Sequence, residues 1–288
     1  MLILLHNWYN IKMNKFIKIN ITKQICLANN LPLTVIAGPC VIESKKQVFA
    51  LAKKLKDICL KEKINFIFKA SYDKANRSSI NSFRGPGLIE GLKILDEIKK
   101  ELKIPVLTDV HCTHDVEKVA QVADIIQIPA FLCRQTDLVV ECAKTGLPVN
   151  VKKGQFLAPE DMFQVVNKIL KFNNKISLTE RGASFGYRNL VVDYRSIEIM
   201  KQFGYPVIFD ATHSVQKPGG LGSASGGDRQ YVLPLAKAAS AVGVSALFIE
   251  VHQNPDKALS DGANSVDLNM FKLMINQTKK IDKLIKGF

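Results

Sequence analysis

Charged and polar side chains recur directly after short apolar runs of this chain. Any one of them could be an ordinary structural residue, but buried charges that meet no partner are costly. So many at equivalent positions indicate partners, a metal ion or a ligand. The residues are Cys40, Lys69, Asp109, His111, Gln127, Lys152, Lys153, Glu180, Arg181, Asp210, His213, Glu250 and His252.

One group of these side chains is cationic. Arginine recognises phosphate and carboxylate in a bidentate manner, and lysine supplies a compact positive charge. The number of cations exceeds what one phosphate needs, which predicts two phosphorylated groups, or a phosphate and a carboxylate. The group comprises Lys69, Lys74, Arg77, Arg84, Arg134, Lys152 and Arg181.

A second group offers a thiolate, an imidazole and two carboxylates, from Cys40, His213, Glu250 and Asp261. This mixed set of soft and hard ligands suits a divalent metal ion such as Zn²⁺, Fe²⁺ or Mn²⁺. The four residues are far apart in the sequence, so the metal site requires a fold that brings their segments together.

The sequence lacks the motifs of several other kinds of active site. The sequence has no G-x-S-x-G nucleophile elbow and no dinucleotide fingerprint, which predicts no organic cofactor. The glycine-rich stretch 217–229 lacks the order of a phosphate loop; we expect a mobile loop over a site, or else a plain flexible connection. The protein would therefore position and neutralise phosphorylated substrates that react with each other.

The elements that must position these residues alternate regularly from residue 33. Continuous apolar runs are typical of strands buried on both faces, as in parallel sheets. Eight such runs end near residues 37, 69, 108, 127, 151, 179, 209 and 249, and each is followed by a stretch of helical period. This pattern predicts one α/β domain, a (β/α)₈ barrel over 33–288, after an N-terminal extension over 1–32; a doubly wound open sheet is the alternative. Closure of the barrel would bring its first, seventh and eighth strands together.

Composition argues against a nucleic-acid-binding, membrane-spanning or secreted protein. The net charge is +14, but many lysines lie on outer helix faces, and no nucleic-acid-binding module is evident. No apolar run approaches the roughly 20 residues that cross a bilayer. Six cysteines without C-x-x-C spacing predict reduced thiols in the cytoplasm. The N-terminus does not resemble a secretory signal, and Met13 offers a second plausible start.

Eight motifs occur in order between about Leu33 and the C-terminus. They are Ala37-Gly-Pro-Cys-Val-Ile-Glu-Ser44, the stretch 68–79, Phe83-Arg-Gly-Pro-Gly87, the stretch 127–137, Asn150-Val-Lys-Lys-Gly-Gln155, Thr179-Glu-Arg-Gly182, Phe185-Gly-Tyr187 and Asp210-Ala-Thr-His213. Together they resemble the 3-deoxy-D-manno-octulosonate 8-phosphate synthases. The related 3-deoxy-7-phosphoheptulonate synthases, which use erythrose 4-phosphate, share the first motif but usually have Pro-Arg-Thr where this chain has Ala75–Ser79; they are the alternative.

The resemblance implies condensation of phosphoenolpyruvate with D-arabinose 5-phosphate by a homotetramer, for a lipopolysaccharide sugar. Phosphoenolpyruvate would bind to Lys69, Lys74, Lys152 and Arg181. Arabinose 5-phosphate would bind to Asn76, Arg77 and Ser78, with Arg134 reaching in from a neighbouring subunit. Lys74 and Asp109 or His111 would transfer protons.

The resemblance also bears on the metal. Metal-independent members have Asn at the position of Cys40, so Cys40 and Lys217-Pro-Gly-Gly220 resemble the metal-dependent group. The segment Ser260–Asn264 departs from both groups, so Asp261 is the ligand that the resemblance supports least.

Overall fold

The computed structural model describes residues 16–187, 189–219 and 226–288. The two candidate start residues, Met1 and Met13, and residues 220–225 of the glycine-rich stretch lie outside the described residues.

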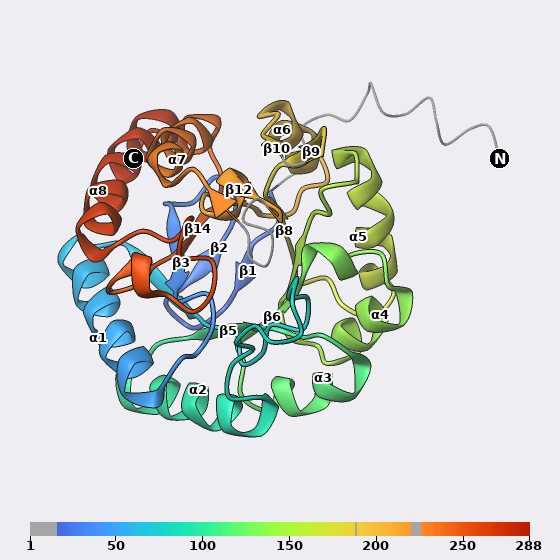
Figure 1. Cartoon of the computed structure of the whole chain (residues 1–288). Coiled ribbons are helices and arrows are strands. Elements are labelled where there is room, and N and C mark those ends of the chain that lie inside the picture. The colour runs from blue at the N-terminus through green and yellow to red at the C-terminus, as the bar shows by residue number, and fades with distance from the viewer. Residues whose placement is uncertain (1–15, 188, 220–225) are drawn as a thin grey trace.

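Eight parallel strands close into a barrel, and helices surround it (Figure 1). β11 pairs with both β8 and β14, and β14 pairs with β3, so the first, seventh and eighth barrel strands are neighbours. The predicted (β/α)₈ barrel is confirmed, and the doubly wound alternative is wrong. The barrel strands are β3 (Thr34–Gly38), β4 (Asn65–Lys69), β5 (Val106–Asp109), β6 (Ile125–Ile128), β7 (Val149–Lys152), β8 (Ile176–Glu180), β11 (Val207–Asp210) and β14 (Ala246–Glu250).

The helices follow the strands as the sequence predicts. In α1, the side chain of Ser44 accepts a hydrogen bond from the backbone N–H of Gln47, which caps the helix, and Leu51 and Leu55 lie on the buried face. The helices are α1 (Lys45–Lys61), α2 (Leu88–Leu102), α3 (Thr113–Ala120), α4 (Thr136–Lys144), α5 (Met162–Leu170), α6 (Arg195–Lys201), α7 (Val232–Val242) and α8 (Leu268–Lys286). Within the described ranges, none of them is long and apolar enough to cross a membrane.

A hairpin of β1 (Ile19–Asn20) and β2 (Cys26–Leu27) covers the amino-terminal end of the barrel. Leu27 packs with interior residues of the barrel. The side chain of Asn29 donates to the carbonyl of Tyr205 at 2.8 Å and accepts from the N–H of Val207 at 2.8 Å, just where β11 begins. Part of the segment that the sequence analysis places in an extension is therefore packed against the barrel.

Two small hairpins lie among the loops that follow the barrel strands. One joins β9 (Ala183–Phe185) to β10 (Asn189–Val191) after β8. The other pairs β12 (Gln216–Lys217) with β13 (Gly226–Gly227), which are the two ends of the glycine-rich stretch.

The last residue of β3 must be glycine for this barrel to close around the site. A Cβ atom on Gly38 would lie 1.9 Å from the backbone carbonyl oxygen of Lys69 on β4. The close approach of the two backbones brings the start of the Cys40 segment next to Lys69.

Candidate active site

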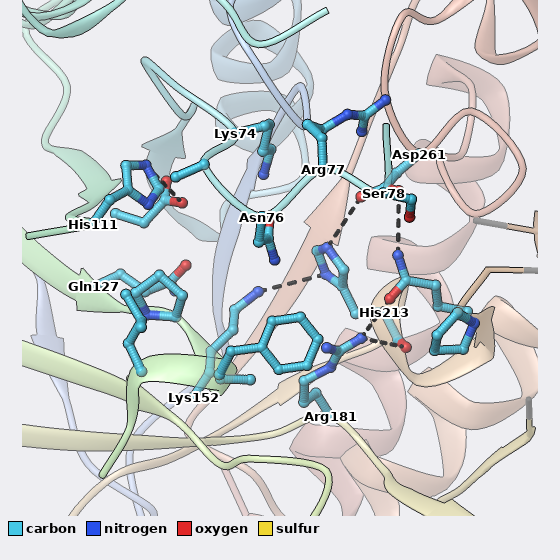
Figure 2. Close-up of a pocket in the computed structure, with 18 of the residues that line it drawn as sticks. Lys74, Asn76, Arg77, Ser78, His111, Gln127, Lys152, Arg181, His213 and Asp261 are labelled. Atoms are coloured by element: carbon cyan, nitrogen blue, oxygen red, sulfur yellow. Dashed lines mark hydrogen bonds and ion pairs between the residues drawn. The ribbon is translucent and has the colours of Figure 1, made fainter. Parts of the chain in front are cut away.

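A cavity of about 420 Å³ opens at the carboxyl ends of the barrel strands. Figure 2 shows Lys74 and Asn76 facing Lys152 and Arg181 across this space. The residues named from the sequence that line it are Lys69, Lys74, Asn76, Arg77, Ser78, Asp109, His111, Gln127, Lys152, Arg181, His213 and Asp261. Cys40 contacts Asp261, and Glu250 lies beside Lys69 and His213. The residues named from the sequence that do not line the cavity include Arg84, Arg134, Lys153, Glu180 and His252.

Two cations from neighbouring strands reach the cavity with different partners. The ammonium of Lys152 donates to Asp210 Oδ2 at 2.5 Å and lies 3.7 Å from the ring centroid of Phe248. Among the residues that the structure describes, the guanidinium of Arg181 donates only to neutral oxygens, those of the His213 carbonyl at 3.2 Å and of the Gln216 side chain at 2.8 Å. Since Arg181 is 6% exposed, it is a buried cation suited to an anionic ligand.

On the opposite side, Lys69 belongs to a buried polar chain. Its ammonium donates to the hydroxyl of Ser71 at 2.9 Å, and that hydroxyl donates to Asp109 Oδ1 at 2.5 Å. The Nε2 atom of His111 lies 3.9 Å from Asp109 Oδ2 and has no hydrogen-bond partner within the described part of the chain. Asp109 and His111 are therefore placed together at the cavity wall.

The segment after β4 contributes Lys74 to Ser78. Arg77 Nη1 donates to the hydroxyl of Ser260 at 2.7 Å, which joins this segment to the segment of Asp261. Arg84, another predicted phosphate ligand, instead pairs with Asp73 and does not line the cavity.

The four predicted metal ligands lie together. The ligand atoms of Cys40, Glu250 and Asp261 lie within 4.8 Å of one another. His213 Nε2 lies 3.4 Å from Glu250 Oε1 and 3.7 Å from Asp261 Oδ2, and its Nδ1 lies 2.6 Å from Asp210 Oδ2. A carboxylate on the second ring nitrogen is the usual support for a metal-ligating histidine.

Two further observations fit a cation at this cluster. Both carboxylate oxygens of Glu250 are buried and accept no hydrogen bond from the described residues. Asp261 has a φ of 49°, a conformation that non-glycine residues seldom adopt and that often marks a functional residue. Both features suit carboxylates held for a positive charge.

The electrostatics of the site follow from burial and from these neighbours. Burial alone would raise the pKa of Asp109, but Lys69 and Lys74 lower it below its ordinary value. Burial raises the pKa of the Cys40 thiol, and Asp261 and Glu250 raise it further. Asp109 is therefore ionised, whereas Cys40 would lose its proton on binding a metal ion.

Asp109 should make the protein sensitive to acid. Because its pKa is lower in the folded state, its stabilising effect is present above its unfolded pKa and is lost as the pH falls through the folded value. Between pH 7 and pH 3, an Asp109→Asn variant should lose less free energy of unfolding than the parent, by about 1 kcal/mol. Urea unfolding at several pH values measures this difference.

The matched control for this experiment is Asp96→Asn, which removes the exposed partner of Lys100. Exposed pairs contribute little, so its curve should follow that of the parent. Parallel curves for the parent and Asp109→Asn would contradict the electrostatic assignment.

Three residues that contact the predicted site residues were not themselves predicted as site residues. Asp210 orients Lys152 and His213, Ser260 lies 3.0 Å from the sulfur of Cys40, and Gln216 joins Arg181 to Asp261. Asp210 was visible as a strand-end residue. Ser260 and Gln216 are uncharged, and only their positions beside Asp261 and Lys217 could have indicated them.

Some strand-end residues do not reach the cavity. His252 lies 3.4 Å from the carboxylate of Glu43 on the outer side of the rim. Lys153 and Glu180 pair with each other behind the cavity wall. Arg134 is exposed and does not line the cavity of its own chain.

The closed barrel and its strand-end cavity, rich in lysine and arginine, define a (β/α)₈-barrel protein with a site for anionic ligands. Comparison with known sequences agrees with this class. The chain belongs to the DAHP synthetase I family, whose sequence profile matches residues 16–287.

Curated relatives are similar over most of their length. The 2-dehydro-3-deoxyphosphooctonate aldolase of Geobacter metallireducens is 55% identical over 92% of this chain and 100% of the relative. Enzymes of the same name from Desulfatibacillum aliphaticivorans and Fusobacterium nucleatum are 54% and 57% identical, over 91% and 88% of this chain and 98% and 91% of the relatives.

Proposed function

We propose that this chain condenses phosphoenolpyruvate with D-arabinose 5-phosphate and water, giving 3-deoxy-D-manno-octulosonate 8-phosphate and inorganic phosphate. It is an enzyme that forms a carbon–carbon bond between two phosphorylated substrates.

The composition of the cavity is the observation that carries this proposal. Two carboxylates, Asp109 and Asp261, face an excess of cations there. Such an excess suits two anionic substrates, one of which bears both a phosphate and a carboxylate. The cations that line the cavity are Lys69, Lys74, Arg77, Lys152 and Arg181.

The second substrate is assigned from the relatives and from one segment. The relatives are named for a phosphorylated octonate, an eight-carbon acid, and arabinose 5-phosphate supplies the five carbons that phosphoenolpyruvate lacks. The segment Ala75–Ser79 at the cavity supports the same choice, because it lacks the Pro-Arg-Thr run of the seven-carbon synthases.

Each substrate has its own side of the cavity in this proposal. Phosphoenolpyruvate binds to Lys69, Lys74, Lys152 and Arg181, which surround the barrel axis. Arabinose 5-phosphate binds nearer the rim, to Asn76, Arg77 and Ser78. Arg134 is exposed, so it takes part only from a neighbouring subunit of a homotetramer, which we propose with a cytoplasmic location.

The reaction then proceeds by addition. C3 of phosphoenolpyruvate attacks the aldehyde carbon of arabinose 5-phosphate, and the aldehyde oxygen takes up a proton. C2, left electron-deficient by this attack, takes up water, which loses a proton to give a hemiketal phosphate. The C2–O bond to phosphate then breaks, the phosphate leaves with the electron pair, and the C2 hydroxyl loses its proton to the phosphate to form the ketone. Lys152 and Arg181 balance the charge of the phosphate and carboxylate throughout.

The groups that would take part in proton transfer are Asp109, His111 and Lys74. Asp109 is ionised because Lys69 and Lys74 lower its pKa against the effect of burial, so it cannot supply a proton, and its charge would favour a proton on His111, 3.9 Å away. His111, whose Nε2 lies at the cavity wall without a partner from the described residues, would carry the proton. Burial lowers the pKa of Lys74, but Cys40 and Asp109 raise it above its ordinary value, so the ammonium of Lys74 would assist as a hydrogen-bond donor to the aldehyde oxygen.

Cys40, His213, Glu250 and Asp261 would hold a divalent metal ion, for which Zn²⁺, Fe²⁺ and Mn²⁺ are the candidates. When bound, such an ion orients and polarises the aldehyde or lowers the pKa of a water molecule.

Phosphate release tests the whole proposal. The protein is assayed with phosphoenolpyruvate plus arabinose 5-phosphate or erythrose 4-phosphate, before and after chelation. Release with the arabinose ester only, lost on chelation and restored by Mn²⁺ or Zn²⁺, is the expected result. Release with erythrose 4-phosphate only would assign the seven-carbon reaction, and no release from folded protein would reject the proposal.

A further inference from the structure

Behind the wall of the cavity, Lys153 and Glu180 form a buried ion pair. Lys153 Nζ lies 3.6 Å from Glu180 Oε1, and each residue is 1% exposed. Neither lines the cavity, although each is the chain neighbour of a residue that does, Lys152 or Arg181.

The alternation of side chains explains this placement. Successive residues of a strand point to opposite faces, so a strand end that directs Lys152 inward directs Lys153 toward the helices. The outward partners agree, since Lys153 Nζ donates to the carbonyl of Leu157, before α5, at 3.4 Å. Glu180 Oε2 accepts from the hydroxyl of Ser196 in α6 at 2.6 Å.

The pair also fixes the backbone on both strands. Glu180 Oε1 accepts from the N–H of Gly182 at 2.6 Å, so its carboxylate closes a short loop around Arg181. The N–H of Lys153 donates to the carbonyl of Thr179 at 2.8 Å, which extends the ladder between β7 and β8. Lys152 and Arg181 are therefore attached to one rigid unit.

Stability alone does not account for such a pair. A buried ion pair is often no more stabilising than apolar side chains of the same volume. Position is the better account, because a displacement of about 1 Å at a reacting group can cost on the order of 10²-fold in rate. Within the described ranges, the guanidinium of Arg181 has only neutral oxygens as partners, so these contacts hold it weakly.

We infer that Lys153 and Glu180 are positioning residues that hold Lys152 and Arg181 at the spacing required by the phosphate and carboxylate of phosphoenolpyruvate. This inference rests on the proposed function, because it assumes phosphoenolpyruvate as the ligand of these two cations.

Two variants and one matched control test the inference. Lys153→Met leaves Glu180 without its cation, and Lys153→Met/Glu180→Gln removes both charges. Lys286→Met is the control, because Lys286 forms a buried pair with Asp282 near Leu31 and Val244, at the other end of the barrel. The measurements are thermal unfolding, KM for each substrate, kcat, and the Kd for phosphoenolpyruvate by calorimetry.

Lys153→Met and Lys286→Met should both unfold at lower temperature, since each leaves a buried carboxylate unpaired. Only Lys153→Met should raise the KM and Kd for phosphoenolpyruvate, by roughly tenfold or more, with KM for arabinose 5-phosphate changed less than about twofold. The double variant should recover stability but should still bind phosphoenolpyruvate weakly. If the pair had a purely structural role, the affinity would recover together with the stability.

Parental affinity for phosphoenolpyruvate in Lys153→Met or in the double variant would overturn the inference, and so would an equal loss in Lys286→Met. A parent that binds phosphoenolpyruvate but releases no phosphate would reject the proposed function instead, and the Kd values would still test the positioning role.

Discussion

Replacing Cys40 with alanine should lower kcat/KM by roughly 10³-fold and leave a protein that no longer retains a divalent metal. The sulfur of Cys40 lies 3.3 Å from Asp261 Oδ2, within the cluster that includes Glu250. Losing a ligand that supports several kcal/mol of transition-state stabilisation gives a rate loss of about this size. Metal content after dialysis and phosphate release measure the two effects separately.

Cys59→Ala is the matched control for this experiment. Cys59 is buried in α1, and burial raises the pKa of its thiol to about 12, so it resembles Cys40 in environment but lies outside the cavity. The control should lose some stability and keep its metal and activity. Full activity of Cys40→Ala after exhaustive chelation would reject a metal role for this cluster.

The cluster illustrates what sequence could predict. Its four residues were chosen for their ligand chemistry, and the barrel was predicted from apolar runs and helical stripes. The two predictions depend on each other, because only closure between β14 and β3 brings Cys40 next to Glu250. The position of these four residues could therefore be predicted once the fold was predicted. Their role as metal ligands stays a prediction.

The direction of side chains at strand ends was less predictable. Side chains alternate along a strand, so an error of one residue in placing the strand exchanges its inward-facing and outward-facing residues. Lys152 and Lys153 are both cations at one strand end, so residue type alone could not decide between them, and the resemblance supported Lys152. The structure directs Lys152 inward and pairs Lys153 with Glu180 outside.

Uncharged residues and very short strands carry no sequence pattern from which they could be predicted. Gln216 and Ser260 act through hydrogen bonds to residues far apart in the sequence, which no local pattern encodes. The strands of the β1–β2 hairpin have two residues each, too few for a period-two pattern, and they were assigned to the N-terminal extension.

Arg181→Met should lower kcat/KM for phosphoenolpyruvate by roughly 10³-fold and at the same time raise the stability of the ligand-free protein. Within the described part of the chain, no carboxylate lies within 4.0 Å of the guanidinium, and its Nε has no hydrogen-bond partner. Burial lowers the pKa of Arg181, although Asp210 and Asp261 act in the opposite direction. The ligand-free protein is thus destabilised by a buried cation that has no anionic partner among the described residues.

A methionine at this position fills a similar volume without a charge, so the free energy of unfolding should rise by about 1 to 3 kcal/mol. Arg84→Met is the control, because Arg84 is an exposed arginine of the same predicted phosphate group that pairs with Asp73 and does not line the cavity. The control should leave the KM for phosphoenolpyruvate unchanged. Its free energy of unfolding should change by no more than about 1 kcal/mol.

Thermal unfolding with and without phosphoenolpyruvate separates the two effects of Arg181→Met. The parent should gain stability from the ligand, whereas the variant should begin more stable and gain little. A variant that is less stable and still responds to phosphoenolpyruvate would mean that Arg181 serves the fold. Opposite changes in stability and affinity would mean that the sequence keeps this arginine for its ligand, since a residue retained for folding does not destabilise the empty site.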